Sequence, residues 1–361
     1  MYKLNIILFT LIFSNFLSAQ YLVEEAEKII RRDSIPEMAF AIITQDSVVM
    51  KKVVGHHKIT EVSSYPTSKI DDYFHLGSNT KAITGFIAAK LVENNKIKWN
   101  TKFFDLFPAL KNKSNSEYLN ITLEDLLSHR AKVQSFTSGV EYQNLPNMEG
   151  SKQERRRKFA AYVLTLQPIQ NEDDYHYSNA GYSIATLMLE KVSGLSWEKL
   201  MDKFLRQELN LNFAFGWPNR NFEHQPYGHW IESGQLVSVS PEIDYDLSMA
   251  EPAGDLSMNI ENYARFIQLN IEGLAGKNNF LKAETYQFIH TNQEAYSIGW
   301  GNYTKDNEQI SEHAGSDGTF FSYVFIDRKN LIGYIVLVNN GSTAAQNGVY
   351  DMFEILKHKV Q

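Results

Sequence analysis

Three short strings in this chain combine a nucleophile with side chains that can accept its proton. They are Ser-Asn-Thr-Lys starting at Ser78, Tyr-Ser-Asn starting at Tyr177 and His-Ala-Gly starting at His313. A serine hydroxyl attacks a carbonyl carbon efficiently only when a positioned base takes its proton. Together the strings predict a serine hydrolase, although Ser-x-x-Lys alone is expected by chance about once or twice in a chain of this length.

Ser78 begins a helix-forming stretch that runs to residue 93, and Lys81 lies one turn further along it. Residues three apart share a helix face, so the lysine nitrogen can approach the serine oxygen. The helix N-terminus adds N–H groups and partial positive charge where an oxyanion would develop. The alternative is that Ser78 only caps the helix and Lys81 lies on the surface, because serine is a preferred cap.

A second Ser-x-x-Lys, formed by Ser196 and Lys199, provides an internal comparison. Ser196 follows Gly194 and precedes a mixed polar and apolar helix, which is typical of an ordinary N-cap. The surroundings of the two copies therefore favour Ser78 as the nucleophile.

Tyr177 and Asn179 lie directly before an apolar helix that includes Ile184. That placement can hold a phenol rigidly at a cleft. Two other Tyr-x-Asn strings begin at Tyr118 and Tyr142 and lack such a helix. The alternative for Tyr177 is a packed aromatic residue whose hydroxyl bonds to the backbone.

His313 and Gly315 fall between two strand-like segments and precede Ser316. A glycine here would allow substrate backbone to approach a strand edge closely. The alternative for a lone histidine is a surface or capping role.

Strand-like runs at both ends of the chain flank a helix-rich middle. The runs cover residues 38–43, 48–54, 296–303, 318–326 and 331–338, with terminal helices at 21–32 and 343–360. This arrangement predicts an α+β fold in which one antiparallel sheet is built from both chain ends and flanked by helices. A helical subdomain, about residues 80–260, is expected to be inserted in the α/β part, with the site between them.

Composition excludes several classes of function. The 361 residues are 43% hydrophobic and 21% charged, and the net charge is −7, which argues against a nucleic-acid binder. The basic run at 155–158 follows Glu154 and is interpreted as a solvated helix face. The chain has no cysteine, so thiol chemistry is excluded. It has neither the Gly-x-Ser-x-Gly motif of α/β-hydrolases nor the His-Glu-x-x-His motif of zinc proteases, so both classes lack support. His224 and His229, five residues apart, are a poor pair of metal ligands.

The N-terminus has the pattern of a secretory signal peptide. Lys3 precedes an apolar run over residues 4–17, and the small residue Ala19 suits cleavage before Gln20. We therefore expect a signal peptide at 1–19, a single mature domain at 20–361 and a periplasmic or secreted location. An uncleaved anchor is the alternative.

The strings named above, with those at 121–129 and 251–256, resemble the class C β-lactamase-like serine hydrolases. That superfamily also contains D,D-peptidases, D-aminopeptidases and carboxylesterases. The resemblance covers nearly all of the mature chain and implies the β-lactamase/transpeptidase-like fold, with no cofactor and no metal. The expected partner is a small ester, peptide or peptidoglycan-like substrate, with neither nucleic acid nor a membrane span.

Carried over by position, the resemblance implies a role for each site residue. Ser78 would form the acyl-enzyme, and Lys81 would help take its proton. Tyr177 would pass that proton to the leaving group, which requires a lowered pKa. Asn179 would donate to the acyl side of the substrate, and the N–H groups of Ser78 and Ser316 would form the oxyanion hole.

Two departures from the family pattern bear on the substrate. His313 stands where β-lactamases and transpeptidases have lysine, and a neutral histidine binds a carboxylate less well. At 129–133 the chain reads His-Arg-Ala-Lys-Val, where relatives commonly show His-Thr-Ser-Gly-Leu. Compensation for the lost cation by Arg130 or Lys132 is a hypothesis.

Esters and small amides or peptides are therefore the favoured substrates. The alternatives are a β-lactamase or D,D-peptidase, and a non-catalytic penicillin-binding or sensor protein.

Overall fold

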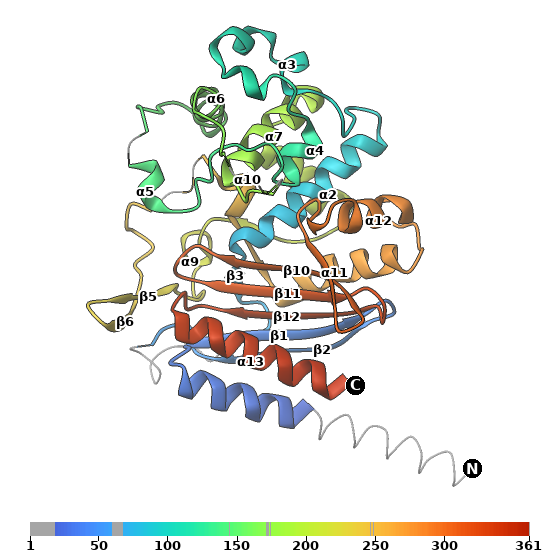
Figure 1. The fold of residues 1–361 in the computed structure, drawn as a ribbon. Helices are drawn as coiled ribbons and strands as arrows, with labels where there is room; N and C mark the ends of the chain where they lie inside the picture. The colour runs from blue at the N-terminus through green and yellow to red at the C-terminus, as the bar shows by residue number, and fades with distance from the viewer. Residues whose placement is uncertain are drawn as a thin grey trace.

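Seven antiparallel strands from the two ends of the chain form one sheet (Figure 1). The structure is a computed structural model that describes residues 19–59, 68–143, 145–170, 173, 175–245, 247 and 249–360. The strand order is β2-β1-β12-β11-β10-β9-β8, so the prediction of a single sheet built from both chain ends is confirmed. The strands are β1 (Glu37–Thr44), β2 (Val48–Gly55), β8 (Ala295–Tyr296), β9 (Gly301–Lys305), β10 (Glu308–Ser316), β11 (Phe321–Asp327) and β12 (Ile332–Val338).

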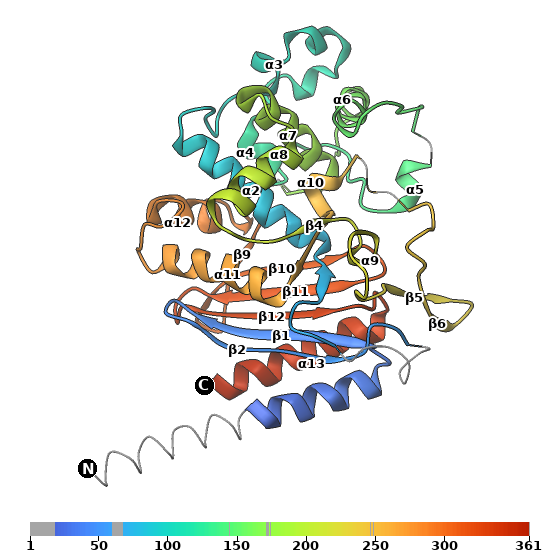
Figure 2. The ribbon, with the colours of Figure 1, turned by 180° about the vertical axis from the view of Figure 1, so that it is seen from behind.

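Helices cover both faces of this sheet (Figures 1 and 2). In chain order the helical segments are η1 (Gly77–Asn79), α2 (Thr80–Glu93), α3 (Phe103–Leu106), η2 (Pro108–Lys113), η3 (Ser116–Tyr118), α4 (Leu123–Leu127), α5 (Gly139–Tyr142), α6 (Lys152–Val163), α7 (Asn179–Ser193), α8 (Trp197–Met201), η4 (Asp202–Glu208), α9 (Pro218–Asn221), α10 (Glu251–Gly254), α11 (Ile260–Leu274), α12 (Ala283–Thr291) and α13 (Thr343–Val360). A further helix over residues 19–32 lies beside α13.

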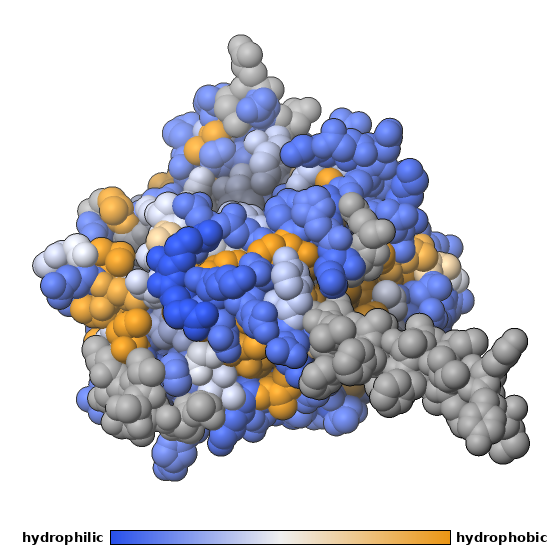
Figure 3. All heavy atoms as spheres, turned by 90° about the horizontal axis from the view of Figure 1, so that it is seen from below, coloured by the Kyte–Doolittle hydropathy of each residue, from blue (hydrophilic) through white to orange (hydrophobic). Residues whose placement is uncertain are grey.

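Strand β1 shows how the sheet separates two apolar cores. Successive side chains of a strand point to opposite faces. Met38 and Phe40 therefore pack with α13 and the helix at 19–32, while Ala39 and Ala41 pack with the large core that includes α11. Seen from below, the surface over α13 is mostly hydrophilic, with some apolar side chains showing between polar ones (Figure 3).

A second, three-stranded sheet positions the segment that carries Ser78. Its strands are β3 (Tyr73–His75), β7 (Leu256–Asn259) and β4 (Ala214–Phe215), in the order β3-β7-β4. β3 runs directly into η1, and β7 follows α10. Pairing of β3 with β7 therefore brings α10 next to η1 and the start of α2. A hairpin of β5 (His229–Glu232) and β6 (Gln235–Ser238) lies apart from it.

Two strand boundaries differ from the sequence prediction. The run at 296–303 is divided into β8 and β9 by a turn in which Ser297 N donates to Trp300 O, with Gly299 at φ 81°. His313 lies inside β10, not between strands. Polar residues such as Glu308 and Glu312 hide the strand pattern there.

The described part of the N-terminal region begins at Ala19. Residues 19–32 are helical, which agrees with the predicted helix at 21–32. The predicted signal peptide lies outside the described residues, apart from Ala19. None of the helices within the described ranges combines the length and the apolar character needed to cross a bilayer.

The basic run at 155–158 is not wholly solvated, and that part of the prediction is wrong. Arg156 is fully buried, and its guanidinium donates to Glu190 (2.9 Å), Glu198 (2.8 Å) and Glu251 (3.0 Å). Burial raises the pKa of Glu251 to about 8. The charge pattern gave no sign of this network, because its carboxylates come from α7, α8 and α10.

Replacing Arg156 with methionine is expected to lower the free energy of unfolding by about 3–5 kcal/mol, since Glu190 and Glu251 would stay buried without their partner. Urea denaturation measures the loss. The neighbouring Arg157→Met is the control, because Arg157 is exposed, and a change within about 0.5 kcal/mol is expected. Equal effects of the two substitutions would contradict a structural role for the buried network.

Candidate active site

Ser78 lies in η1, one turn before Lys81 at the start of α2. Its side chain is partly exposed although both chain neighbours, Gly77 and Asn79, are buried. The Lys81 Nζ is 3.1 Å from the Ser78 Oγ. The predicted approach of these two side chains on one helix face is therefore present.

Lys81 is fully buried and has two further hydrogen-bond acceptors. Its Nζ donates to Asn179 Oδ1 (2.6 Å) and to the carbonyl oxygen of Ala253 (2.9 Å). Burial lowers the pKa of Lys81 well below its usual value of 10.5. A neutral amine has two hydrogens and one lone pair. As an ammonium, Lys81 donates to all three oxygens; once deprotonated, it would keep its two hydrogens on the carbonyl-type oxygens and turn its lone pair to the Ser78 hydroxyl.

Asn179 holds the lysine in place. It is the first residue of α7, whose N-cap Ser178 accepts a hydrogen bond from Gly181 N (3.0 Å). While Asn179 Oδ1 accepts from Lys81, its Nδ2 donates to Phe136 O (2.9 Å). The amide thus orients Lys81, and because Nδ2 carries two hydrogens, the donation to substrate stays a prediction.

Tyr177 lies at the predicted position, but its ionisation differs from the expectation. Its ring centroid is 4.6 Å from Lys81 Nζ, and its hydroxyl is hydrogen-bonded to Ser78. Desolvation raises the pKa of Tyr177 above its ordinary value, and the bond to Ser78 only partly offsets this. The expected lowering is wrong because burial disfavours the charged phenolate. Tyr177 is therefore a phenol, the form that donates a proton.

His313 is buried and neutral. Its Nδ1 donates to the carbonyl oxygen of Ala314 (2.7 Å), so Nε2 carries the lone pair and accepts from the Tyr296 hydroxyl (2.8 Å). Desolvation, with a smaller contribution from Lys81, lowers the pKa of His313 to about 3. The ring centroid of His313 is 6.2 Å from that of Tyr177. The side chain thus belongs to the aromatic wall of the site and contributes no positive charge at neutral pH.

Gly315 makes room for the protein's own backbone. A β-carbon there would lie 2.1 Å from Leu76 O and 2.8 Å from Ser78 N. The sequence predicted that substrate backbone would approach this glycine closely. In the structure, the segment that carries Ser78 lies against it. A β-carbon at Gly77 would likewise lie 2.4 Å from Ser316 N, so these contacts bring the backbone nitrogens of Ser78 and Ser316 to the junction of η1 with β10.

Substitution of Gly315 by alanine is expected to push η1 off β10 and lower kcat/KM by at least about 100-fold, because a displacement of about 1 Å misaligns a nucleophile. Steady-state kinetics on an activated ester measures the loss. Gly139→Ala is the control, because nothing lies within 4 Å of its added β-carbon. Retention of full activity by Gly315→Ala would contradict this packing role.

The departures at 129–133 have structural explanations. The guanidinium of Arg130 donates to the carbonyl oxygens of Ser128 (2.9 Å), Tyr296 (2.8 Å) and Glu294 (2.6 Å), so it fastens the β8 region to the loop. Lys132 adopts a φ of 53°, in the left-handed region where glycine is most at ease. Neither observation supports the hypothesis that these cations replace the missing lysine.

The comparison strings take ordinary structural roles. Ser196 caps α8 and accepts a hydrogen bond from Lys199 N (3.4 Å), which confirms its interpretation as a cap. Tyr118 is buried in the core, and the Tyr142 hydroxyl donates to Phe136 O.

Sequence reasoning missed three contributors to the site. Ala253 contributes its backbone carbonyl oxygen, and the identity of a side chain does not reveal such a role. The residue lies in the string at 251–256 that supports the family resemblance. Tyr296 donates to His313. His129 packs its ring 4.3 Å from that of Tyr177, and desolvation lowers its pKa well below the usual value.

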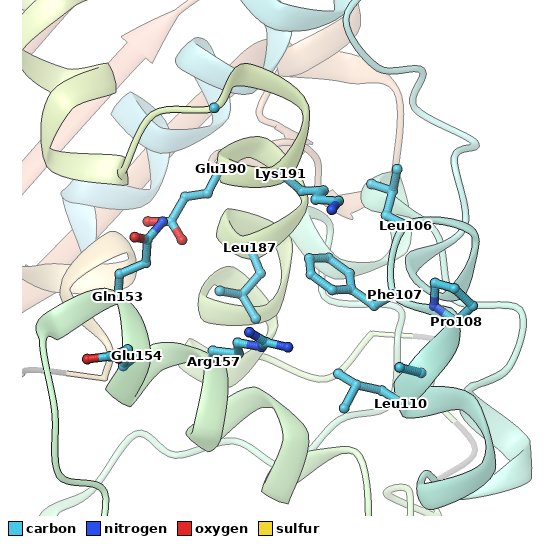
Figure 4. Close-up of a pocket in the computed structure, with 12 residues that line it drawn as sticks. Leu106, Phe107, Pro108, Leu110, Gln153, Glu154, Arg157, Leu187, Glu190 and Lys191 are labelled. Atoms are coloured by element: carbon cyan, nitrogen blue, oxygen red, sulfur yellow. The ribbon is translucent and has the colours of Figure 1, made fainter.

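The cavity in Figure 4 is separate from this site. It has a volume of about 630 Å³ and is lined by apolar residues such as Phe107 and Leu110 on one side and by Leu187 and Lys191 of α7 on the other. Asn179 begins α7, so Lys191 lies about 18 Å along the helix from it. The cavity therefore cannot hold a substrate that reacts with Ser78.

Comparisons with known proteins show relatives over most of the chain. Protein flp of Staphylococcus aureus (strain N315) is 22% identical over 348 residues, covering 93% of this chain and 67% of that protein. The unguisins hydrolase ungD' of Aspergillus campestris is 23% identical over 352 residues, covering 91% and 62%. The chain thus spans about two thirds of the length of these curated relatives.

Solved structures match the fold over nearly the whole chain. The octameric penicillin-binding protein homologue from Pyrococcus abyssi has a TM-score of 0.75 at 20% identity, covering 94% of this chain and 77% of that one. The class C β-lactamase from Rhodobacter sphaeroides has a TM-score of 0.73 at 15% identity, covering 93% and 99%. The Beta-lactamase family model matches residues 22–356. The chain therefore belongs to the Beta-lactamase family, whose members are typically serine hydrolases, and has the class C β-lactamase-like α+β fold.

Proposed function

We propose that this protein is a secreted serine hydrolase that cleaves an ester or a small amide or peptide through an acyl-enzyme on Ser78. One observation carries the proposal. Lys81 is buried, and its Nζ has two carbonyl-type acceptors and the Ser78 hydroxyl within 3.1 Å. This arrangement suits a neutral amine that acts as a base. A relative named as a hydrolase of unguisins supports hydrolysis in general.

Acylation follows from these contacts. The Ser78 hydroxyl gives its proton to the Lys81 amine while Oγ bonds to the substrate carbonyl carbon. The negative charge that develops on the carbonyl oxygen is stabilised by the N–H groups of Ser78 and Ser316, each donor being worth about 3 kcal/mol. When the bond to the leaving group breaks, that group takes a proton from Tyr177, which regains one from the Lys81 ammonium. A water molecule reverses the sequence, frees Ser78 and releases the acid.

The neutral state of His313 favours substrates without a carboxylate at this position. A buried imidazole with a pKa of about 3 supplies no cation at neutral pH. Family members with lysine here have such a cation, so efficient β-lactam hydrolysis is disfavoured. A kinetic panel of neutral short-chain esters, D-amino-acid peptides and a chromogenic β-lactam tests the proposal. Neutral esters are expected to react fastest, and preference for the β-lactam would overturn the substrate assignment.

His313→Gln is expected to leave the acid limb of the kcat/KM profile unchanged, because the histidine is neutral from pH 5 to 9. The loss in kcat/KM is expected to stay below the roughly 100-fold that removal of a general acid or base costs. Profiles recorded on one neutral ester check both statements. A clear displacement of the acid limb would show that His313 titrates during catalysis.

A non-catalytic penicillin-binding or sensor protein is the main alternative. The rate at which the acyl group leaves Ser78 distinguishes a sensor from a hydrolase. A fluorescent activated ester should label Ser78 transiently in a hydrolase and persistently in a sensor. Rapid turnover supports the proposal, and stable stoichiometric label would overturn it. N-terminal sequencing of the secreted protein tests the proposed signal cleavage and the periplasmic or secreted location.

A further inference from the structure

Glu37, His57 and Asp72 form a buried cluster that the reaction above does not use. Their side chains are 0–1% exposed, and one donor atom of each lies within 4.8 Å of the others. Glu37 begins β1, His57 follows β2, and Asp72 precedes β3. Three segments distant in the sequence therefore bring a histidine and two carboxylates to one point.

The cluster lacks the partners that buried carboxylates require. Among the described residues, no hydrogen bond reaches either oxygen of Glu37 or Oδ1 of Asp72. His57 Nε2 lies 2.9 Å from Asp72 Oδ2 but without hydrogen-bond alignment, and His57 Nδ1 has no partner in that part of the chain. Unpaired buried carboxylates are costly, so a ligand with positive charge would stabilise the folded state.

We propose that Glu37, His57 and Asp72 bind one divalent transition-metal ion, with Zn²⁺ the best match, in a structural site. Two carboxylates balance the double positive charge, and an imidazole ligand disfavours Ca²⁺ and Mg²⁺. Zinc bonds of about 2.0–2.2 Å place tetrahedral ligand atoms about 3.3 Å apart. His57 and Asp72 need to separate by only a few tenths of an ångström, one oxygen of Glu37 would be the third ligand, and a water molecule would take the fourth position.

The backbone around the cluster is already held in place. Asn339 Oδ1 accepts from Glu37 N (2.8 Å), and its Nδ2 donates to His57 O (3.2 Å). A surface hollow of about 660 Å³ is lined in part by Pro36 and His56, the chain neighbours of Glu37 and His57. Asp72 lies six residues before the nucleophile, so the ion would tie β1 and β2 to the strand that leads to it. The inference stands independently of the proposed function.

Zinc content and melting temperature test the site. The purified protein is stripped with a chelator, titrated with zinc chloride, and measured by elemental analysis and thermal unfolding. One zinc per chain and a rise in melting temperature of several degrees are expected. Glu37→Gln keeps the shape but removes a ligand charge, so its zinc affinity should fall by more than about tenfold. Without zinc it should melt no lower than the wild type, because it removes a buried acid.

Two exposed residues provide matched controls. Glu223 and His224 lie on an exposed loop. The variants Glu223→Gln and His224→Ala should keep full zinc uptake, as should Ser78→Ala. Zinc uptake and a zinc-dependent melting shift that persist unchanged in Glu37→Gln would overturn the proposal. A wild-type protein that takes up no zinc and melts identically with and without it would overturn the proposal equally, and would identify the cluster as a hydrogen-bonded acid pair.

Discussion

Ser78→Ala is expected to lower kcat on an activated ester by on the order of 10⁶-fold, because loss of the nucleophile removes the acyl-enzyme route entirely. Stoichiometric labelling by an acylating probe should disappear with it. The melting temperature should change little, since Ser78 Oγ is partly exposed and makes no side-chain cap. Label transfer and steady-state kinetics measure the two effects separately.

The chain contains its own control for this experiment. Ser196→Ala removes the serine of the second Ser-x-x-Lys, where the hydroxyl caps α8. It should cost about 1 kcal/mol of stability and leave labelling and turnover intact. Label that persists in Ser78→Ala, or that is lost in Ser196→Ala, would assign the nucleophile elsewhere.

Lys81→Arg is expected to lower kcat/KM by about 10³- to 10⁴-fold, the size of a general-base contribution. Arginine keeps the positive charge but cannot be deprotonated in a protein. It therefore cannot accept the proton of Ser78, and no lone pair faces the hydroxyl. Lys199→Arg is the matched control and should have wild-type activity. Near-normal activity of Lys81→Arg would exclude the amine as the base.

The pH profile of the wild-type enzyme tests the same assignment. Only neutral Lys81 can act as a base, so kcat/KM should rise with pH as Lys81 loses its proton. Burial lowers the pKa of Lys81 well below 10.5, so the rise should be complete well below that pH. A limb centred near 10.5 would indicate an unperturbed surface lysine and would contradict the role given to Lys81.

The overall fold was largely predictable because its elements repeat local patterns. Nearly continuous apolar runs at 38–43 and 331–338 correspond to β1 and β12, and the last helix has the predicted bounds 343–360. β10 was missed because charged residues such as Glu308 and Glu312 interrupt its apolar pattern. The buried Arg156 was missed for a related reason: a basic run is typical of a solvated face, and its carboxylate partners lie 34 to 95 residues away.

The site was predictable where it depends on spacing within one helix. Ser78 and Lys81 are three residues apart, and helix geometry alone brings their side chains together. Tyr177 and Asn179 required recognition of the helix they precede. The family resemblance assigned roles to them, and the contacts add structural ones: Asn179 holds Lys81, and Gly315 admits the backbone of η1.

The sequence by itself determined the nucleophile, its lysine partner and the α+β sheet built from both chain ends, because these follow from spacing and periodicity along the chain. Only the tertiary structure decided the protonation states. Burial removes water from Lys81 and lowers its pKa, and the groups that enclose it, Asn179 and Ala253, lie 98 and 172 residues away. His313 is neutral because the fold buries it against Tyr296. Desolvation depends on what surrounds a group in space, and that information appears only when distant segments meet.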